Sequence, residues 1–463
     1  MGYTQKVVII GAGISGLACA FRLKQLGVQS LLLEASDHPG GMIATIRRDG
    51  HLFELGAQSP RFPASVWGLL RDLHLDQEFV AGDAKARRYI LRNGKLRRAP
   101  FSPGGLIATD LLRGSSKLRI LSEIFRFSRP PAEEETLAAF VERKFGKDVL
   151  VNLVDPVVST VFFADACKMG MESAFPALVN WERSHGSVAR GAIRARAKNK
   201  RTSMKVTDSL PSLGTLRPGM GRLPERLAEE MGPHIRYGAR VTSIVRGKAS
   251  WEVVLSHGEH FFAEHVVLAL PADEAAKALD TSVPPLAMEF RKIAYEAICV
   301  VSGGYERRKV KNPLDGFGFM VPRSEGLRTI STFWNSSQFP ERAPDGRVLI
   351  TSFARCGEIR DMDALEGIVA AENAAILGIT GEPEVRNFWQ HPRALPQYNV
   401  GHRRVVGAIQ EALGGAPNLH VAGNYLEGRA IGDCVDLAQR VAEKVHSRLQ
   451  AANIKAVGVN LKE

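Results

Sequence analysis

The beginning of the chain alternates between apolar runs and a segment of helical period. Residues 6–10 form an apolar, β-branched run, and residues 29–33 form a second one. Between them, residues 17–26 place apolar side chains three and four positions apart, and Gly27 follows the last of them. This spacing predicts a strand, a helix that ends at the glycine, and another strand. We therefore predict a βαβ unit.

The middle of the chain has a mainly helical pattern. Between about residue 111 and residue 201, helical periodicity marks residues 118–127, 137–145 and 181–197, and a further stretch from residue 149 that Pro156 should break or kink. Beyond it, residues 219–231 predict a helix, and residues 235–245, 251–255 and 261–270 predict strands. The helical region is thus predicted to be an insertion.

The rest of the chain is predominantly strand-forming. Residues 286–400 predict a second strand-rich region with turns at Gly303-Gly304, residues 316–318 and Asp345-Gly346. Residues 418–423 predict one more strand, which leads through a glycine-rich turn to a helix over residues 435–449. The last segments therefore place a glycine-rich turn against a helix N-terminus.

The formal net charge of +12 raises the question of which anionic partner the protein binds. Such an excess fits nucleic acid, an anionic membrane surface or an anionic substrate. The cations cluster in residues 85–98 and 190–205, and no recognised nucleic-acid-binding module accompanies either cluster, so nucleic acid is the least favoured partner. In the first cluster, residues 88–91 predict a half-buried strand before an Asn93-Gly94 turn, and such a strand can direct a cation into a cavity.

Cysteine and histidine usage excludes several classes of site. The five cysteines are odd in number, widely spaced and without a Cys-x-x-Cys pair, which argues against a disulfide framework and favours a reducing compartment. The twelve histidines lack metal-ligand spacing, so we predict no metal. No apolar run approaches the roughly 18 residues of a membrane helix, and no signal peptide is predicted.

The turn after the first predicted strand has the dinucleotide fingerprint in its required context. Gly11 allows the tight turn, Gly13 lets the backbone approach a pyrophosphate, and Gly16 allows the helix to pack closely on the strand. The free N–H groups of the helix start face the phosphates. Glu34 follows the second strand, where an acid accepts hydrogen bonds from ribose hydroxyls.

The next segment separates a flavin from a nicotinamide. The Gly40-Gly41 pair lies just beyond Glu34, and it resembles the extended FAD motif of the amine oxidase and protoporphyrinogen oxidase superfamily. FAD is therefore the favoured cofactor, bound without a covalent link because the Gly-Asp-Cys context of Cys434 resembles noncovalent enzymes. The predicted cofactor-binding residues are Gly11, Ala12, Gly13, Ile14, Ser15, Gly16, Glu34, Ala35, Gly40, Gly41, Met42, Gly56, Ala57, Gln58, Ser59, Val241, Gly423, Asn424, Ala430, Ile431 and Gly432.

Over nearly its whole length the sequence closely resembles the oxygen-dependent protoporphyrinogen oxidases. The matching motifs are residues 11–16, 40–41, 53–56, 88–89, 93–97, 161–165, 316–322, 336–340, 395–402, 423–424 and 432–434. The resemblance implies an α/β fold, α+β overall, with a Rossmann-like FAD domain, a mixed-sheet substrate domain and an inserted helical domain that contacts membranes. We expect the FAD domain at residues 1–85, 205–285 and 405–455, the substrate domain at 86–110 and 286–404, and the helical domain at 111–204.

The implied reaction removes six electrons from protoporphyrinogen IX in three steps, using three O₂ and yielding three H₂O₂. A reduced tetrapyrrole is an apolar disc with carboxylate arms, so its site needs apolar walls and a cation for a propionate. By resemblance Arg88 binds the propionate, Phe317 stacks on a pyrrole, and Ala164 lines the pocket. Asp165 departs from the family, which commonly has glycine there. No general base stands out, so no catalytic side chain is predicted and positioning against the flavin carries the reaction.

Other functions remain open at this point. Coproporphyrinogen III, with four propionates, is a rival substrate, because the basic residues 85–98 suit additional carboxylates. An amine oxidase, a carotenoid desaturase and a non-enzymatic flavoprotein are more remote alternatives. We expect a cytoplasmic protein with peripheral contact to the inner membrane through the helical insertion and residues 190–205. The family further implies a homodimer.

Overall fold

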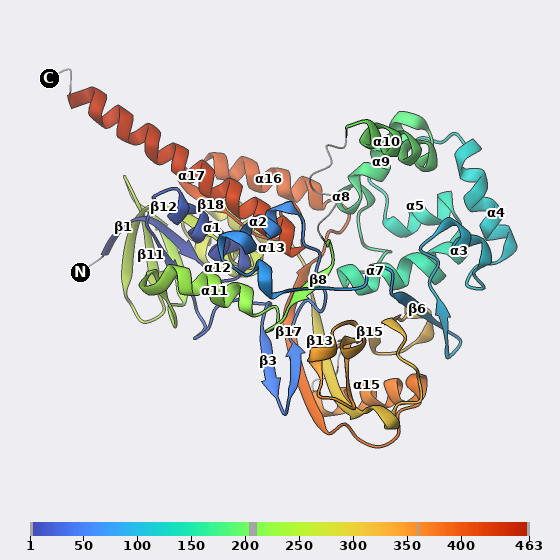
Figure 1. Ribbon diagram of the computed structural model, residues 1–463. Coiled ribbons are helices and arrows are strands. Elements are labelled where there is room, and N and C mark those ends of the chain that lie inside the picture. Colours follow the sequence, from blue (N-terminus) through green and yellow to red (C-terminus); the bar gives the residue numbers. More distant parts are fainter. Residues whose placement is uncertain (1–2, 203–210, 358, 360, 461–463) are drawn as a thin grey trace.

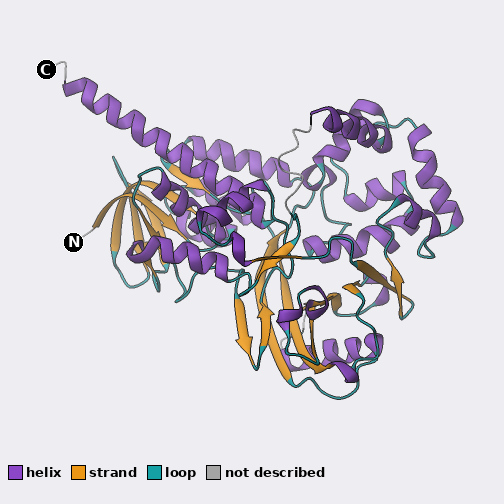
Figure 2. Ribbon diagram, viewed as in Figure 1, coloured by secondary structure: helices purple, strands orange, loops and turns teal. Residues whose placement is uncertain are grey.

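The computed structural model describes residues 3–202, 211–357, 359 and 361–460. Most strands of the described chain gather in two seven-stranded sheets, and two further pairs, Thr45–Arg48 with His51–Glu54 and Phe79–Ala81 with Gly214–Leu216, form small sheets. Residues 103–202 form a helical lobe on the right of Figure 1. Figure 2 shows that this lobe consists of helices joined by loops, whereas both large sheets are flanked by helices. The mixed α/β fold expected from the sequence is thus confirmed.

The first sheet contains both predicted strands of the βαβ unit. Its order is β10-β11-β12-β1-β2-β9, and β18 pairs with β12. The strands are β1 (Tyr3–Ile10), β2 (Ser30–Leu33), β9 (Ile235–Arg236), β10 (Val241–Arg246), β11 (Trp251–Leu255), β12 (His260–Leu268) and β18 (Leu419–Val421). Strand β1 pairs in parallel with β2 and β12, and successive β1 side chains enter two different core clusters. Burial on both faces explains why its sequence is uniformly apolar.

Two helices cover the end of this sheet where the cofactor motif lies. Helix α1 (Ile14–Gln25) follows β1 directly, and it packs along α17 (Ile431–Asn460), the long helix that reaches the C-terminal end in Figure 1. Helices α2 (Ala64–Asp72), α11 (Arg222–Met231), α12 (Ala272–Leu279), α13 (Pro284–Arg291) and α16 (His402–Gly414) complete this part. Segments far apart in sequence therefore meet at one sheet.

The prediction of one continuous strand over residues 235–245 was wrong. The chain forms β9, leaves the sheet at Gly238, whose φ of 66° is left-handed, and re-enters it as β10. Because β9 pairs with β2 and β10 pairs with β11, the two halves lie on opposite edges of the sheet. Glycine permits this reversal since it adopts positive φ without a Cβ clash.

The second sheet has the order β17-β13-β16-β15-β14-β6-β7. Its strands are β6 (Arg87–Arg92), β7 (Lys95–Arg98), β13 (Tyr295–Glu306), β14 (Gly316–Met320), β15 (Thr329–Trp334), β16 (Arg347–Arg355) and β17 (Val385–Pro396), and α15 (Met362–Leu377) packs on it. The predicted turn at Asn93-Gly94 joins β6 to β7, with φ of 49° and 69°. That hairpin is confirmed.

Two glycine turns predicted in this region were wrong, because the glycines lie inside strands. Gly303 and Gly304 belong to β13, and a Cβ on Gly304 would lie 2.5 Å from the His51 ring and 2.6 Å from Val385. Gly318 belongs to β14, and its Cβ would lie 2.0 Å from the Thr332 carbonyl oxygen. Here glycine serves close approach between neighbouring segments instead of chain reversal.

The helical lobe differs from its prediction in two places. Its helices are α3 (Pro103–Ala108), α4 (Gly114–Ser122), α5 (Leu137–Lys144), α6 (Lys147–Val149), α7 (Asp155–Phe162), α8 (Met171–Ala174), α9 (Pro176–His185) and α10 (Val188–Thr202). The single helix predicted over 181–197 is divided, because Gly186 ends α9 in a left-handed conformation with φ of 65°. Pro156 does not end the helix, because the chain stays helical from residue 147 to residue 162. The helix is irregular there, since a π-helical segment, Leu150–Val154, directly precedes α7, and the proline lies in the first turn of α7.

A buried ionic network holds this lobe together. Lys144 and Glu182 are 3% and 0% exposed and lie 2.9 Å apart. Glu182 also accepts hydrogen bonds from Arg143 and Ser128, and Lys144 further pairs with Glu123. Burial raises the pKa of the Glu182 carboxyl, but its hydrogen-bond donors outweigh burial and lower the pKa to about 2.

A depressed carboxylate pKa stabilises the fold above the pKa of the unfolded chain and loses that effect as the pH falls toward 2. We therefore expect Glu182→Gln to destabilise the lobe by about 1.5 kcal/mol at pH 7, with the deficit shrinking as the pH falls below about 4. Urea unfolding followed by far-UV circular dichroism and by tryptophan fluorescence, to which the lobe contributes Trp181, measures it. Glu443→Gln, at an ion pair whose carboxylate is half-exposed, should change stability little, and an equal deficit for both variants would contradict the assignment.

Candidate cofactor and substrate sites

The turn between β1 and α1 has the geometry of a phosphate-binding loop. Gly11 has a φ of 101°, and a Cβ there would lie 2.6 Å from the carbonyl oxygen of Ala269. A Cβ on Gly16 would lie 1.9 Å from the carbonyl oxygen of Gly11. Gly13, by contrast, has no heavy atom within 4 Å of its Cβ position. Two glycines are thus required by the protein's own backbone, whereas Gly13 faces open space at the N-terminus of α1.

Glu34 lies beside this turn, at the end of β2. Its carboxylate accepts a hydrogen bond from the backbone N–H of Ala12 at 2.6 Å and from the N–H and hydroxyl of Ser36 at 2.9 and 2.8 Å. Its carbonyl oxygen accepts from the N–H of Ala239, which brings Val241 at the start of β10 to the same end of the sheet. The carboxylate is only partly buried, so it remains available to a ribose.

The Gly40-Gly41 pair folds back on the first turn. The Gly40 N–H donates to the Ala12 carbonyl at 2.8 Å, and Gly40 forms a bridge with Gly13. Both members of the pair have positive φ, 112° and 59°. Ala35 is exposed and makes no contact with the turn that the structure records. The two glycine motifs, which the family resemblance assigns to one cofactor, therefore lie side by side.

Residues 56–59 extend this site toward the second sheet. A Cβ on Gly56 would lie 2.2 Å from the Met42 carbonyl oxygen, so the two segments touch at their backbones. Gln58 is buried, donates to the Gly56 carbonyl, and accepts from the Asn335 amide at 2.7 Å. Beside half-buried Ala57, the Ser59 hydroxyl is buried and has no hydrogen-bond partner among the described residues. An unsatisfied hydroxyl and an open Gly13 fit a bound dinucleotide.

The C-terminal glycine-rich turn reaches the same place. Helix α17 begins at Ile431, and the Cys434 thiol forms a hydrogen bond with Ser15 in the first turn of α1. Gly432 packs on the ring of Pro63, and Asn424 accepts from the hydroxyl of Tyr398 at 2.8 Å. Gly423 directly precedes Asn424 in the sequence, and Ala430 directly precedes the first residue of α17. Two helix N-termini therefore converge, each favouring negative charge.

A row of aromatic side chains leads away from this site across the second sheet. The rings of Phe317 and Phe333 lie 5.6 Å apart, those of Phe333 and Phe353 5.6 Å, and those of Phe353 and Phe163 5.0 Å. Met42 packs against the same cluster. The cluster that holds this row therefore contacts a predicted cofactor residue, Met42, and the row ends at the predicted pyrrole-stacking residue, Phe317.

Arg88 lies at the far end of this row. Its guanidinium is 4.7 Å from the Phe317 ring centre, and its strand register places it opposite Gly318. It has no acidic partner within 4 Å among the described residues. Burial, followed by the nearby charge of Arg61, lowers its pKa, while Asp83 opposes them. A half-buried cation beside another cation is ready to receive a carboxylate.

The neighbouring Arg87 shows that strand alternation distinguishes the two arginines. Its guanidinium pairs with Asp315 on the surface, and Tyr89 donates to the same carboxylate at 2.8 Å. Successive strand residues point to opposite faces. Arg88 therefore lies on the aromatic face, and Arg87 does not.

The segment after α7 supplies the remaining predicted substrate residue. Ala164 is 2% exposed, and its carbonyl oxygen accepts from Arg323 at 3.1 Å. It follows Phe163, which is left-handed with a φ of 47°. The Asp165 carboxylate accepts from the Cys167 N–H at 2.9 Å and so closes the next turn. The acid that replaces the family's glycine thus has a local structural partner.

Comparison with known families settles the class of protein. Residues 14–446 match the family described as flavin-containing amine oxidoreductases. The chain belongs to this family. It is therefore a flavoprotein and an oxidoreductase, as its glycine motifs predicted.

Named relatives in this family act on porphyrinogens. The chain is 31% identical to the chloroplastic protoporphyrinogen oxidase of Oryza sativa subsp. japonica, over 96% of this chain and 88% of that protein. It is 27% identical to the coproporphyrinogen III oxidase of Bacillus subtilis (strain 168), over 93% and 95%. A crystal structure from Exiguobacterium sp. 255-15, provisionally assigned as a protoporphyrinogen oxidase, matches with a TM-score of 0.82 at 23% identity, over 97% and 100%. That structure supports the fold.

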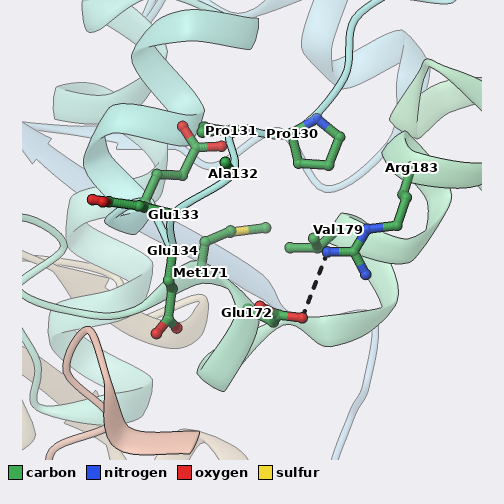
Figure 3. Close-up of a pocket in the computed structure, with 10 residues that line it drawn as sticks. Pro130, Pro131, Ala132, Glu133, Glu134, Met171, Glu172, Val179 and Arg183 are labelled. Atoms are coloured by element: carbon green, nitrogen blue, oxygen red, sulfur yellow. Dashed lines mark ion pairs between the residues drawn. The ribbon is translucent and has the colours of Figure 1, made fainter. Parts of the chain in front are cut away.

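One pocket of this flavoprotein lies away from both sites, in the helical lobe (Figure 3). The side chains of Glu133 and Glu134 lie on one side of it, and Glu172 lies near Arg183, with which it forms an ion pair at 3.7 Å. Glu134 accepts hydrogen bonds from Ser173 and from the N–H of Gly401, so it joins the lobe to the chain before α16. A pocket lined by carboxylates repels an anionic substrate. We therefore interpret this pocket as the place where the helical lobe attaches to the segment before α16, and not as the substrate site.

Sequence reasoning missed several residues that the structure places near the predicted ones. Phe333 in β15 and Phe353 in β16 lie outside the recognised motifs, and only the pairing of β14 with β15 and of β15 with β16 reveals them. Arg429 stands inside a motif that was recognised, between Gly428 and Ala430, and a lone cation in a glycine-rich turn was the available signal. Arg61 lies two residues beyond Ser59 and was also overlooked.

Proposed function

We propose that this flavoprotein oxidises protoporphyrinogen IX to protoporphyrin IX, removing six electrons with three O₂ and releasing three H₂O₂. The supporting observation is the aromatic row that runs from Met42 at the cofactor site to Phe317 and the unpaired Arg88. Its apolar surface suits a reduced tetrapyrrole, and its terminal cation suits a propionate. The names of the relatives point to the same substrate class.

Noncovalent FAD supplies the two-electron acceptor when bound and passes the electrons to oxygen. Residues 11–16, 40–42 and 56–59 would hold its pyrophosphate and ring, and Glu34 its ribose. Burial raises the pKa of the Cys434 thiol to about 11, so this cysteine stays protonated and unsuited to a covalent flavin link. The domain division at residues 1–85, 205–285 and 405–455, 86–110 and 286–404, and 111–204 belongs to this proposal.

Substrate positioning accounts for the chemistry without a side-chain base. The phenyl rings of the row hold the disc and exclude water, and Arg88 fixes its distance from the cofactor site through a carboxylate arm. Protons leave the pyrrole nitrogens to solvent. Phe163 and Ala164 would line the same surface near the reacting carbon. No metal is required by this scheme, and its absence stays a prediction.

Aerobic porphyrin fluorescence tests this proposal. The purified yellow protein is given protoporphyrinogen IX and coproporphyrinogen III in parallel, and rates are corrected for autoxidation. Preference for protoporphyrinogen IX with three H₂O₂ per porphyrin supports the proposal, and preference for coproporphyrinogen III moves the protein to the sister reaction. If the protein oxidises neither porphyrinogen, both porphyrinogen oxidase functions are contradicted, and amines become the substrates to test.

Peripheral contact with a membrane is the second part of the proposal. Large apolar side chains are exposed on the helical lobe: Ile107, Leu118 and Leu121, and Phe125 at 85% exposure. Arg126 and Arg129 are exposed beside them. An apolar patch flanked by cations fits an anionic leaflet. Of the basic run 190–205, residues 203–205 lie outside the described residues. No helix in the described part of the chain is long and apolar enough to span a bilayer.

The double variant Leu118→Asp/Phe125→Asp should reduce co-sedimentation with vesicles containing anionic lipid by at least about tenfold, because two apolar side chains no longer enter the interface. Met288→Asp provides the matched control, since Met288 is 59% exposed on α13, away from the lobe. Equal vesicle binding by all three proteins would contradict the contact. A cytoplasmic location and a homodimer remain predictions.

A further inference from the structure

The short helix α14 (Asn335–Gln338) joins the cofactor site to the strand that carries Phe317. At its first residue, the Asn335 amide donates to the Gln58 side-chain oxygen at 2.7 Å. At its last residue, the Gln338 amide donates to the carbonyl oxygen of Gly316 at 3.2 Å, and Gly316 directly precedes Phe317. The two amides of α14 therefore contact both the predicted flavin-lining segment and the strand of the predicted pyrrole-stacking residue.

Hydrogen bonding fixes the orientation of the Asn335 amide. The Gln58 Nε2 group donates to the carbonyl oxygens of Glu54 and Gly56 at 3.0 and 2.9 Å. Because a carbonyl oxygen can only accept, Gln58 must present its Oε1 atom to Asn335, and Asn335 must answer with its Nδ2 donor. The Asn335 Oδ1 atom is left over. It is buried and has no hydrogen-bond partner in the described part of the chain.

The same reasoning identifies a second free acceptor on Gln338. Its Nε2 group faces the Gly316 carbonyl oxygen, which cannot donate, so Oε1 is the remaining atom. That oxygen is also buried and without a hydrogen-bond partner among the residues that the structure describes. Buried acceptors without donors are uncommon in native proteins. The two amide oxygens therefore suit a ligand that donates hydrogen bonds.

A reduced tetrapyrrole supplies such donors. Its four pyrroles are joined through tetrahedral carbons, so each ring can tilt and direct its N–H out of the mean plane of the macrocycle. An oxidised porphyrin is planar and keeps two N–H groups, which point to the centre of its ring. An acceptor above the disc therefore distinguishes the two oxidation states, because only the reduced one can donate to it.

We propose that the amide oxygens of Asn335 and Gln338 accept pyrrole N–H groups of the substrate, and that they bind a porphyrinogen more tightly than the porphyrin made from it. This inference rests on the proposed function and holds for either porphyrinogen. When the macrocycle becomes planar, its N–H groups turn away from both oxygens, and the product loses contacts that held the substrate. An amide oxygen is too weak a base to take the pyrrole proton, so protons still leave to solvent. Both residues bind substrate, and no covalent bond is made or broken at them.

Paired measurements on protoporphyrinogen IX and protoporphyrin IX test the proposal with the FAD-loaded enzyme. Gln338→Met should raise KM for the porphyrinogen roughly five- to tenfold, because one hydrogen bond to a buried acceptor is lost. The dissociation constant of the porphyrin, measured by quenching of tryptophan fluorescence, should stay within about twofold of the parent value. Asn335→Leu should act in the same direction. Gln390→Met is the matched control, because this amide lies in β17 of the same sheet and contacts Cys356 on the side that α15 covers.

Binding without turnover separates the possible roles of these amides. Ultrafiltration of protoporphyrinogen IX with the photoreduced holoenzyme under anaerobic conditions should show weaker binding by Gln338→Met. Equal losses for porphyrinogen and porphyrin would indicate a purely structural role and overturn the proposal, as would unchanged affinity for both. Weaker FAD binding with unchanged porphyrinogen binding would assign the oxygens to the imide N–H of the flavin, which has the same donor chemistry, and would also overturn it. If the parent enzyme oxidises neither porphyrinogen, the proposed function fails, and the anaerobic comparison still decides whether these amides bind pyrroles.

Discussion

Gly13→Ala is expected to fold normally and to bind FAD roughly a hundredfold more weakly than the parent chain. Its Cβ position has no protein atom within 4 Å, and its φ of −70° is available to alanine. The protein alone therefore has no reason to reject the methyl group. A bound pyrophosphate is expected to exclude the methyl group, because the backbone of Gly13, the second glycine of the fingerprint, must approach the phosphates closely at the helix N-terminus. Flavin content after purification and fluorescence titration of the apoprotein with FAD measure the loss.

Two other glycines separate cofactor binding from folding. Gly367→Ala also adds a methyl group to a position without neighbours within 4 Å, in α15 of the other sheet region, and should retain full flavin. Gly16→Ala should impair folding itself, since its Cβ would lie 1.9 Å from a backbone oxygen. If Gly13→Ala bound FAD as tightly as the Gly367→Ala control, the pyrophosphate would not lie at this turn.

Local patterns predicted the βαβ unit and its glycine-rich turn well because these parts are contiguous in sequence. The strand, glycine turn and helix of the βαβ unit require particular residues at fixed offsets, and Gly11, Gly16 and Gly40 each have a positive φ or a backbone contact that excludes a side chain. Such requirements are visible without knowing the rest of the fold. The meeting of residues 11–16 with the start of α17 was predicted only through the family resemblance.

Contacts between distant strands could not be predicted in this way. The hydrogen bond between Gln58 and Asn335 joins residues 277 positions apart. Gly303 and Gly304 carry a turn signal in sequence, yet the side chains of His51 and Val385 explain why glycine is needed within a strand. The local pattern shows that a side chain is missing, and only the tertiary neighbours show why.

Composition alone also does not show which charged side chains are buried. Glu54 is 2% exposed, and its carboxylate pairs with Arg342 at 3.0 Å and accepts from the Met220 N–H at 2.9 Å. Burial raises its pKa against the effect of the arginine. These three residues come from three separate segments of the chain. Glu54 was part of a recognised motif, but its role in joining the segments became visible only in the fold.

Arg88→Ala should lower kcat/KM for a porphyrinogen roughly 30- to 150-fold, which corresponds to a loss of about 2 to 3 kcal/mol of binding free energy, while FAD remains bound. The guanidinium is half-buried on the Phe317 ring without an acidic partner among the described residues, so a substrate carboxylate is the group that would neutralise it. That carboxylate is bound equally in the ground and transition states. The loss should therefore fall mainly on KM, with kcat little changed. Initial rates of porphyrin fluorescence over a range of substrate concentrations separate the two constants.

Arg87→Ala is the matched control, because it removes the same side chain one residue earlier in β6. Its guanidinium pairs with Asp315 on the surface face, so its loss should leave KM within about twofold of the parent value. Arg88→Lys should recover part of the affinity, since it retains the charge but loses the bidentate geometry. A large effect of Arg87→Ala with none of Arg88→Ala would mean that the substrate lies on the opposite face of β6, because adjacent strand residues point to opposite sides. If neither substitution changed KM, the carboxylate would be bound elsewhere, and the row of phenyl rings would no longer mark the path of the substrate to the cofactor.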